Sequence, residues 1–208
     1  MKHEWRKAEK QYYLPGAKPE IIRLPSFNFI TIKGEGNPNE ELFAQNIKTL
    51  YSISYAIKMS LKKLEIKPLN YQDYTVYPLE GVWDLNDEAK KKFTGMINKD
   101  DLVYTLMIRQ PDFVDFACFE RLREATQRKK PELKLNALQF ASIEDGECIQ
   151  FLHKGSFNGE PASFEIMEDF AKKHGKTRAS KKHREIYLSD FRKVPAEKLK
   201  TVLRFRIN

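Results

Sequence analysis

Glu185 and Tyr187 are the two residues of this sequence whose types and spacing most favour chemistry. They lie in the run REIYL, residues 184–188, where polar and apolar side chains alternate as in a β-strand. The alternation places both on one face, while Ile186 and Leu188 point the opposite way, where we expect the helices. A carboxylate beside a phenol in an aromatic pocket is poorly solvated, so its basicity rises, which suits a cationic ligand or general-base catalysis. The alternative is an exposed glutamate on an edge strand, paired with solvent or with a cation.

Aromatic residues from several other segments could line a pocket beside this pair. Aromatic side chains bind flat apolar or cationic molecules through contact area, stacking and cation–π attraction. At helical or strand spacing they are more often core residues, so both interpretations stay open. Arg109 shares a strand face with Met107 and could be a charge at the rim or an ion-pair partner. The aromatic and sulfur-containing candidates are Trp83, Tyr51, Tyr55, Tyr74, Tyr77 and Met107.

Other motifs that could hold a metal, a cofactor or a nucleophile are incomplete. GKT at residues 175–177 matches the end of a phosphate-binding P-loop, but Phe170 occupies the position of its first glycine. The histidines lack metal-ligand spacing, and Cys118 and Cys148 form no C-x-x-C pair, so we expect neither a metal nor a cofactor. His153, at a predicted strand end, is either a structural residue or a base.

The composition is that of a globular protein. The chain has 208 residues, of which 41% are hydrophobic and 32% charged, enough to bury a core without disulfides. No apolar stretch approaches the roughly 20 residues of a membrane-spanning helix, and the first residues lack the apolar centre of a secretory signal, so we predict a cytoplasmic protein. Much of the net charge of +8 lies in residues 172–184, which we interpret as a solvated basic loop. Contact with nucleic acid is the less favoured alternative.

Hydrophobic periodicity and turn residues predict the elements of the first part of the chain. We expect a strand at residues 27–33, then a helix capped by Asn37 that runs to about Glu65. Strands follow at residues 71–77 and 101–109, around the turn PLEGVWD at residues 78–84. Asp112 is expected to cap a second helix to about Lys130, which packs Phe113 against the core.

The second part repeats this pattern. We expect strands at residues 135–141 and 147–153 joined by a hairpin at Asp145-Gly146, a helix from Pro161 to Gly175, and strands at residues 184–188 and 201–207. Lys-Gly pairs and helix-opening prolines recur at offsets of 121 (154 − 33) and 123 (161 − 38) residues. We therefore predict an α+β fold of duplicated β-α-β-β modules that form an antiparallel sheet with helices on one side. A ligand groove would lie between pseudo-symmetric halves, residues 20–130 and 131–208.

Several segments of the chain resemble one known family. Residues 184–204, REIYLSDFRKVPAEKLKTVLR, resemble the C-terminal signature of the GyrI-like small-molecule-binding proteins, which are related to the effector-binding domains of AraC-type and MerR-type regulators. VYPLEGVWD at 76–84, LVYTLMIRQPDFV at 102–114 and FLHKGSFNGEPASFEIM at 151–167 support the resemblance. It implies one domain over residues 1–208 that binds flat hydrophobic or cationic aromatic compounds. Regulatory members carry a helix-turn-helix domain, but only about 25 residues precede the first predicted strand, so we expect no DNA-binding domain.

The resemblance also implies roles for single residues. The family's central glutamate corresponds to Glu185, and some stand-alone members hydrolyse cyclopropanoid DNA-alkylating compounds. We therefore expect Glu185 to act as general base, with Tyr187 orienting it or donating to an oxyanion. Phe191 stands where a proline is expected. Phe157 stands where a tyrosine is common, which puts any contact of that tyrosine's hydroxyl in doubt. The expected substrate-binding residues are Trp83, Tyr51, Tyr55, Tyr77, Met107, Arg109, Phe113, His153 and Phe157.

Two other functions stay open at the level of sequence. The same pocket would serve a non-catalytic protein that sequesters drugs or reports them to a partner. A gyrase-inhibitor-like role with a protein partner is the weaker alternative. The sequence identifies neither the natural ligand nor the oligomeric state, monomer or dimer.

Overall fold

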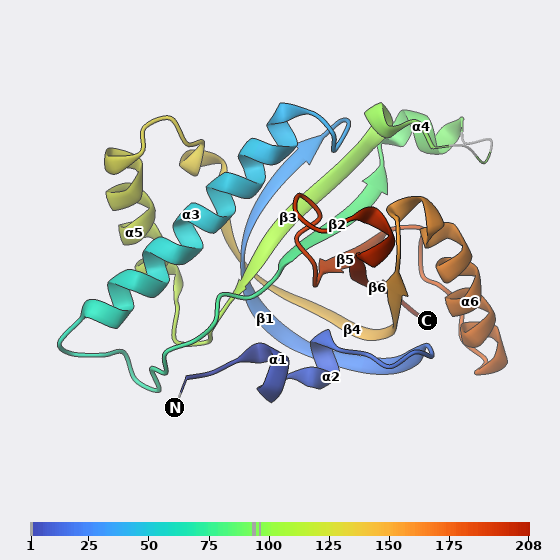
Figure 1. Ribbon diagram of the computed structural model, residues 1–208, viewed down its shortest axis with the longest axis horizontal. Helices are drawn as coiled ribbons and strands as arrows, with labels where there is room; N and C mark the ends of the chain where they lie inside the picture. The colour runs from blue at the N-terminus through green and yellow to red at the C-terminus, as the bar shows by residue number, and fades with distance from the viewer. Residues whose placement is uncertain (1, 93–94, 96) are drawn as a thin grey trace. The chain divides into compact units, whose positions relative to one another are not determined.

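The computed structural model describes residues 2–92, 95 and 97–208 (Figure 1). Contacts divide the chain into two compact units, each built from segments that are far apart in the sequence. The first unit comprises Met1–Glu4, Phe27–Tyr77 and Leu85–Ile143, and the second comprises Trp5–Ser26, Pro78–Asp84 and Glu144–Asn208. Both combine helices with antiparallel strands, so the α+β class is confirmed. The duplicated modules and their halves stay a prediction.

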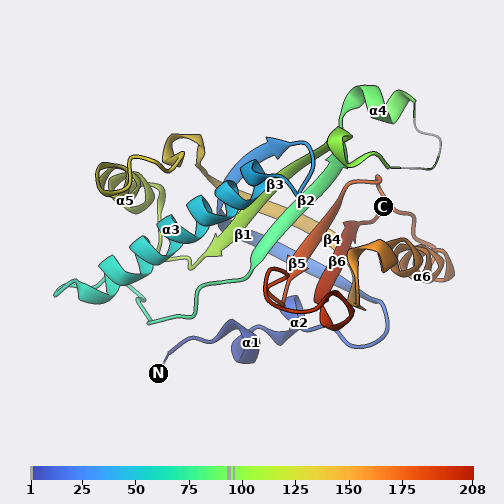
Figure 2. The same ribbon diagram turned by 45° about the horizontal axis from the view of Figure 1, so that its top comes forward.

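The first unit pairs two long strands beneath two helices. β1, Glu20–Glu35, enters this unit at Phe27 and pairs antiparallel with β3, Leu102–Gln110. The helix α3, Glu41–Lys63, contacts both β3 and α5, Phe116–Lys129, as Figure 2 shows. The apolar face of α3 is buried through Phe43, Ile47, Leu50, Ile53, Ile57 and Leu61. The shorter helices of this unit are α4 (Asp87–Lys91), η1 (Lys99–Asp101) and η2 (Leu135–Ala137).

Gly34, near the end of β1, is required by a close approach of a side chain. A Cβ atom at this position would lie 2.4 Å from ring atoms of Tyr104 on β3. The Tyr104 ring in turn packs edge-on against Phe43 of α3, with 5.1 Å between ring centroids. Glycine therefore lets the strand pair and the helix share one aromatic contact.

The described strands of the second unit form one antiparallel sheet in the order β2, β5, β6, β4. Their bounds are Leu79–Leu85 for β2, His183–Tyr187 for β5, Lys200–Arg206 for β6 and Gln139–Lys154 for β4, which enters this unit at Glu144. The register places Gly81, Glu185, Leu203 and Phe151 opposite one another in a row across the sheet. Residues paired in this way lie on the same face.

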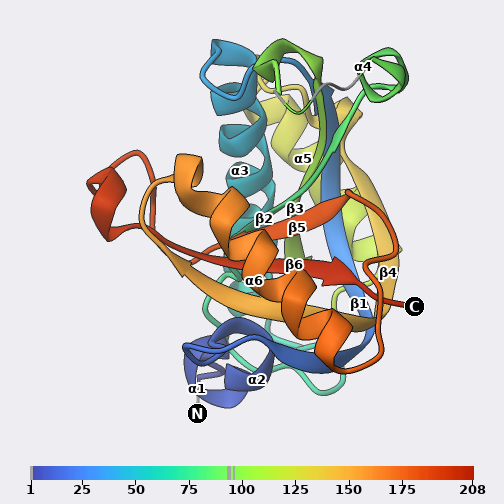
Figure 3. The same cartoon turned by 90° about the vertical axis from the view of Figure 1, so that its right-hand side faces the viewer.

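The helix α6, Glu160–Lys173, covers that face of the second unit (Figure 3). Its residues Met167 and Ala171 pack against Ile149, Leu203 and Phe205. Because Leu203 lies directly opposite Glu185, the glutamate is on the helix-covered face. The prediction that Glu185 points away from the helices is therefore wrong for α6. Glu185 lies on the same face as the apolar residues Leu203 and Phe151, which α6 covers.

The opposite face of this sheet carries buried charges. The guanidinium of Arg184 donates to Glu80 Oε2 at 2.9 Å and to Asp145 Oδ1 at 3.2 Å. Arg204, which pairs with Arg184 in the register, donates to the backbone carbonyl of Tyr12 at the end of α2. The bond of Arg204 attaches the N-terminal helix α2 (Lys10–Tyr13), which follows α1 (Trp5–Ala8), to the sheet of the second unit.

Most predicted elements are confirmed, with changes at their ends. The strands predicted at 27–33, 101–109, 184–188 and 201–207 lie in β1, β3, β5 and β6, and the helix opened by Pro161 is α6. The predicted helix caps are wrong in position. Asn37 Oδ1 accepts from the amide of Asn39 in a turn before α3, and Asp115 rather than Asp112 caps α5 by accepting from the amide of Cys118 at 2.7 Å.

Three other predicted elements are wrong. Residues 71–77 form no strand and contribute one isolated bridge, between Tyr74 and His3, because their aromatic side chains are buried by packing rather than by a ladder. The predicted turn at 78–84 is instead β2, in which Gly81 pairs with Glu185. The predicted hairpin at Asp145-Gly146 is absent, since β4 continues through both residues with φ of 68° at Gly146.

Among the described residues, no helix combines the length and the apolar character that crossing a bilayer requires.

Candidate functional site

Glu185 accepts hydrogen bonds from several side chains of the second unit. The Tyr187 hydroxyl donates to the Glu185 carboxylate, and the indole N–H of Trp83 on β2 donates to the Tyr187 hydroxyl oxygen at 2.9 Å. Burial, followed by the charge of Glu185, raises the pKa of Tyr187, so this phenol keeps its proton. Glu185 is 8% exposed and Tyr187 9%. The relay from Trp83 through Tyr187 therefore holds Glu185 in one orientation.

Glu160, the first residue of α6, is the second carboxyl group of this site. It is 7% exposed and makes a side-chain hydrogen bond with Glu185. Burial, then the charge of Glu185 and this hydrogen bond, raises the pKa of Glu160 to about 10. At neutral pH Glu160 is thus a neutral acid that donates to Glu185. Its other oxygen, Oε1, is buried and has no hydrogen-bond partner among the described residues.

His183 approaches Glu185 from the same strand. Its Nε2 lies 3.2 Å from Glu185 Oε1, and its Nδ1 lies 3.2 Å from the carbonyl oxygen of Lys181. A carbonyl oxygen can only accept, so Nδ1 is the donor in the contact with Lys181. The imidazole ring packs edge-on against Phe164 of α6, with 4.7 Å between centroids. These contacts fix the ring beside the carboxyl pair.

Two further aromatic rings pack against Tyr187, which is hydrogen-bonded to Glu185. Phe157, Tyr187 and Phe191 contact one another edge-on, with ring centroids 6.1, 6.0 and 5.5 Å apart. Phe157 is 37% exposed, so its ring reaches the surface while the Tyr187 hydroxyl is buried. Edge-to-face rings present both their electron-rich faces and their edges to a bound molecule. The cluster can thus bind an aromatic ligand next to two carboxyl groups.

The chemistry open to this site follows from its protons. Glu160 keeps its proton at neutral pH because burial and the charge of Glu185 raise its pKa, and it shares that proton in its hydrogen bond with Glu185. A site of this kind can catalyse by general acid and general base, or it can bind an organic cation through the carboxylates and the aromatic faces. Within residues 2–92, 95 and 97–208, no group of three or more His, Cys, Asp or Glu side chains is arranged to hold a metal ion.

The structure brings together four of the predicted site residues in the second unit. Glu185 and Tyr187 are in direct contact, and Trp83 and Phe157 both contact Tyr187. His153 lies in the same unit, but both of its ring nitrogens are engaged, Nδ1 with Ser163 Oγ at 2.8 Å and Nε2 with the Ser156 carbonyl at 2.9 Å. These bonds hold the start of α6, which carries Glu160.

The other predicted substrate-binding residues lie in the first unit. Tyr51 and Tyr55 stack along α3 with centroids 6.3 Å apart, and Tyr55 is 51% exposed. The buried guanidinium of Arg109 lies 3.5 Å from the centroid of Phe27 and 4.7 Å from that of Tyr77. Their role in a pocket stays a prediction.

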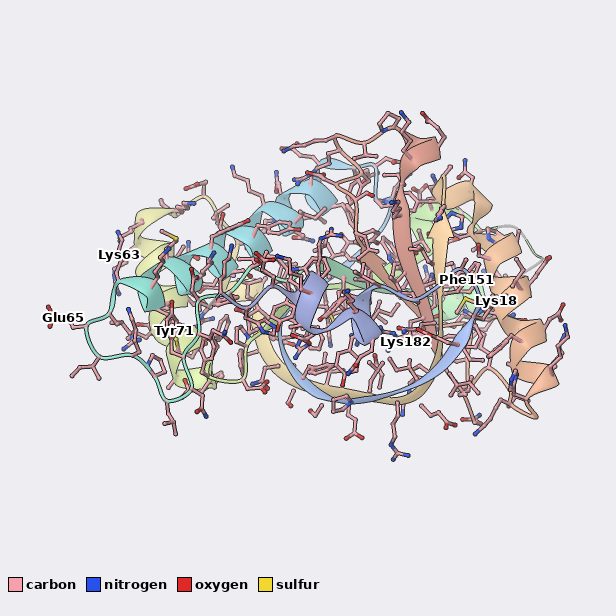
Figure 4. All side chains as sticks on the ribbon, turned by 60° about the horizontal axis from the view of Figure 1, so that its bottom comes forward. Lys18, Lys63, Glu65, Tyr71, Phe151 and Lys182 are labelled. Atoms are coloured by element: carbon pink, nitrogen blue, oxygen red, sulfur yellow. The ribbon has the colours of Figure 1, made fainter. Side chains whose placement is uncertain are left out.

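Met107 and Phe113 are packed inside the first unit. Met107 is 1% exposed. Phe113 packs against Tyr74 and against Tyr71, which Figure 4 labels in the segment after α3. Their predicted contact with a ligand is likewise untested.

Sequence reasoning missed Glu160, His183 and Phe164. An acidic residue before Pro161 is explained by the positive end of the helix dipole, and no pattern indicates that it meets Glu185. His183 could have been found, because it is two residues from Glu185 and shares its face of the strand. Figure 4 labels Lys182, directly before β5, and Phe151, whose ring packs on the α6-covered face.

The family described as "GyrI-like small molecule binding domain" matches residues 17–208. The chain belongs to the GyrI-like family. The match covers most of both units and confirms the resemblance to this family.

Solved structures similar to this GyrI-like protein fall into two groups. A hydrolase from Listeria innocua is 36% identical to this chain, with a TM-score of 0.89, and the match covers all of both chains. An uncharacterized conserved protein from Listeria innocua is also 36% identical, with a TM-score of 0.89, and the match covers 99% of this chain and 100% of that one. The C-terminal domain of EcmrR has a TM-score of 0.54 at 11% identity, covering 92% of this chain and 97% of its own, and shares the fold alone. No curated protein matches this chain.

Proposed function

We propose that this GyrI-like protein binds flat aromatic small molecules at the Glu160–Glu185 pair and hydrolyses electrophilic ones, with cyclopropanoid compounds as the substrate class. The observation that carries the proposal is the buried, hydrogen-bonded pair of Glu160 and Glu185, in which Glu160 keeps its proton, beside the rings of Trp83, Tyr187 and Phe157. An acid and a base at one buried site are what ring-opening hydrolysis needs.

The proposed reaction uses one water molecule. Glu185 removes a proton from the water as the water oxygen forms a bond to a carbon of the strained ring. The ring C–C bond breaks, and its electron pair moves into the conjugated carbonyl, whose oxygen takes the proton of Glu160. A proton then passes from Glu185 to Glu160 and restores the starting state. Each acid or base step of this kind contributes a rate factor of about 100 to 10,000.

The other residues of the site position this pair. Tyr187 and Trp83 hold the orientation of Glu185 through two successive hydrogen bonds. The Phe157 and Phe191 rings would hold the aromatic body of the substrate, which keeps the strained carbon near the water. Two solved structures of hydrolases from Listeria innocua, 35% and 36% identical over at least 99% of this chain, favour turnover over simple binding.

A second candidate function is non-catalytic binding for sequestration or sensing. It is favoured by the contacts of Glu185, which meets donors on Tyr187, Glu160 and His183. Hydrogen bonds to a carboxylate stabilise its ionised form and reduce its basicity. A carboxylate held in this way binds a cation well but removes a proton from water less readily. A cytoplasmic location is predicted for either function.

The deciding experiment is mass-resolved turnover of a cyclopropanoid alkylating agent. Wild type is compared with Glu185→Gln, with a blank without protein, and with Glu165→Gln, which changes an exposed glutamate on the same helix. We expect wild type and Glu165→Gln to form water-added product over many turnovers and Glu185→Gln to bind without turnover. Stoichiometric loss of the compound without water-added product would exclude the hydrolase and favour the sequestering protein. Unchanged turnover in Glu185→Gln would remove this residue from the chemistry.

A further inference from the structure

The buried Glu160–Glu185 pair has one acceptor that no described residue uses. Glu160 Oε1 lacks a hydrogen-bond partner among the described residues, although Glu160 is only 7% exposed. An unsatisfied buried oxygen is costly in the free protein, and a positive group placed beside it would satisfy it. The oxygen therefore marks the place where a ligand's positive charge is stabilised best.

We infer that an aromatic monocation that binds at this site displaces the carboxyl proton of Glu160, whereas a neutral aromatic ligand leaves that proton in place. The inference rests on the proposed function in one respect, because both need aromatic ligands to bind at this cluster. It assigns a specificity-determining role to Glu160, a residue that the resemblance did not indicate.

Charge balance explains why the exchange is favourable. The free pair carries one proton and one negative charge. If a cation entered while the proton left to solvent, the total charge of the buried site would stay the same, and both carboxylates would face a positive group. A neutral ligand preserves the same total charge by leaving the proton in place. Since a change of net charge in a buried site is strongly unfavourable, each ligand class selects its own protonation state of Glu160.

The neighbouring charged groups leave Glu160 as the source of the exchanged proton. Both ring nitrogens of His153 on β4 are held in hydrogen bonds, Nε2 with the Ser156 carbonyl and Nδ1 with Ser163 Oγ. Trp83 on β2 carries no titrating proton, and the residue of β6 opposite Glu185 is the apolar Leu203.

Groups on the adjoining loops are paired with one another. Arg178 lies over the Phe164 ring but donates to Glu168 at 2.8 Å, and Asp190 is bonded to Arg192. Arg184 lies on the opposite face of the sheet, with Glu80. Tyr187 keeps its proton because its pKa is raised. Nε2 of His183 contacts Glu185, so an experiment must separate a proton of His183 from that of Glu160.

Isothermal titration calorimetry with an isosteric pair of probes tests the exchange. 1-Methylquinolinium is the cation and 1-methylnaphthalene its neutral counterpart. Each is titrated at pH 7.5 in phosphate, HEPES and Tris, whose ionisation enthalpies differ, so the slope of heat against ionisation enthalpy counts the protons released. We expect about one proton per bound cation and about none for the neutral probe. Between pH 7 and 8.5, wild-type affinity for the cation should rise about tenfold per pH unit, while affinity for the neutral probe stays flat.

Three variants assign the proton. In Glu160→Gln, an amide replaces the neutral acid, so we expect cation binding to be weaker, with no proton release and no dependence on pH. Glu165→Gln should behave like wild type, and His183→Gln should still release the proton. Release that persists in Glu160→Gln and disappears in His183→Gln would overturn the inference, because the proton would then belong to the His183–Glu185 contact.

The wild-type titration alone separates the two proposals. If both probes bind without proton release, the exchange is refuted while aromatic binding at this cluster stands. If neither probe binds, the proposed binding function and the exchange both fail. Wild-type protein is sufficient for these two outcomes, so the test holds even where a variant does not fold.

Discussion

Replacing Glu160 with glutamine should stabilise the folded protein increasingly as the pH rises. In the folded state burial and the charge of Glu185 raise the pKa of Glu160 to about 10, whereas in the unfolded chain an ordinary glutamate titrates near 4.5. The folded state therefore keeps a proton that the unfolded state has lost. The stabilising contribution of this proton is complete below about pH 4.5 and declines as the pH rises toward 10. Glutamine donates a similar hydrogen bond to Glu185 and has no proton to lose.

The size of the effect follows from the linkage of one proton. Across the window between the unfolded and folded pKa values, the free energy of unfolding of wild type should fall by about 1.4 kcal/mol per pH unit relative to Glu160→Gln. Between pH 5.5 and 8.5 the difference between the two proteins should grow by about 4 kcal/mol. Wild type has other titrating groups, but the variant shares them, and they cancel in the comparison.

Urea denaturation at pH 5.5, 7.0 and 8.5 measures this difference. Glu165→Gln is the matched control, because Glu165 is exposed on the same helix, and we expect its stability to follow wild type at each pH. The m-values should agree among the three proteins, which shows that the same surface is exposed on unfolding. Parallel stability curves for wild type and Glu160→Gln would mean that Glu160 is ionised in the folded protein. That result would refute both the acid role of Glu160 and the proton that it is inferred to exchange.

Three further changes test the contacts around the site and the fold. Tyr187→Phe removes the hydroxyl between an indole and Glu185, so it should lower the free energy of unfolding by about 1 kcal/mol and slow hydrolysis; wild-type values for both would show that the relay does not position the glutamate. Arg184→Met removes the cation that pairs with the buried Glu80, so the free energy of unfolding, measured by urea denaturation, should fall by about 3–5 kcal/mol. A fall of less than about 1 kcal/mol would contradict the buried ion pair. Gly34→Ala places a Cβ atom 2.4 Å from a tyrosine ring, so it should lower the free energy of unfolding by about 1–3 kcal/mol, as measured by thermal unfolding. Gly16→Ala, with open space around it, should leave the stability nearly unchanged, and equal effects of the two changes would refute the close approach.

The sequence predicted the strand that carries Glu185 but not the surroundings of that residue. Alternation in REIYL correctly placed Glu185 and Tyr187 on one face, because the period of a strand is a local property. Which face a helix covers depends on packing between distant segments, so the expected position of α6 was wrong. The strand β2 was missed for the same reason, since Gly81 is held by pairing with Glu185, more than 100 residues away.

Local signals also explain the wrong hairpin and helix caps. Asp145-Gly146 is a favoured turn pair, but pairing of β4 with β6 continues on its C-terminal side, and Gly146 adopts a positive φ within the strand instead. Asn37 and Asp112 are good capping residues a few positions before each helix. The structure uses Asp115 for α5, and this choice depends on where the helix meets the core rather than on residue type.

The position of Glu160 shows how tertiary contacts reverse a local preference. At the first turn of a helix the dipole stabilises an ionised carboxylate by about 0.3–1 kcal/mol, and by about 2 kcal/mol at most. The rise of the Glu160 pKa from 4.5 to about 10 corresponds to about 7 kcal/mol in the opposite direction. Burial beside Glu185 therefore exceeds the dipole severalfold, and the acid at the start of α6 is neutral. From the sequence alone, Glu160 is explained by its favourable interaction with the helix dipole, but in the structure it is the proton donor of the candidate site. Both the proposed hydrolysis and the inferred cation exchange depend on this proton.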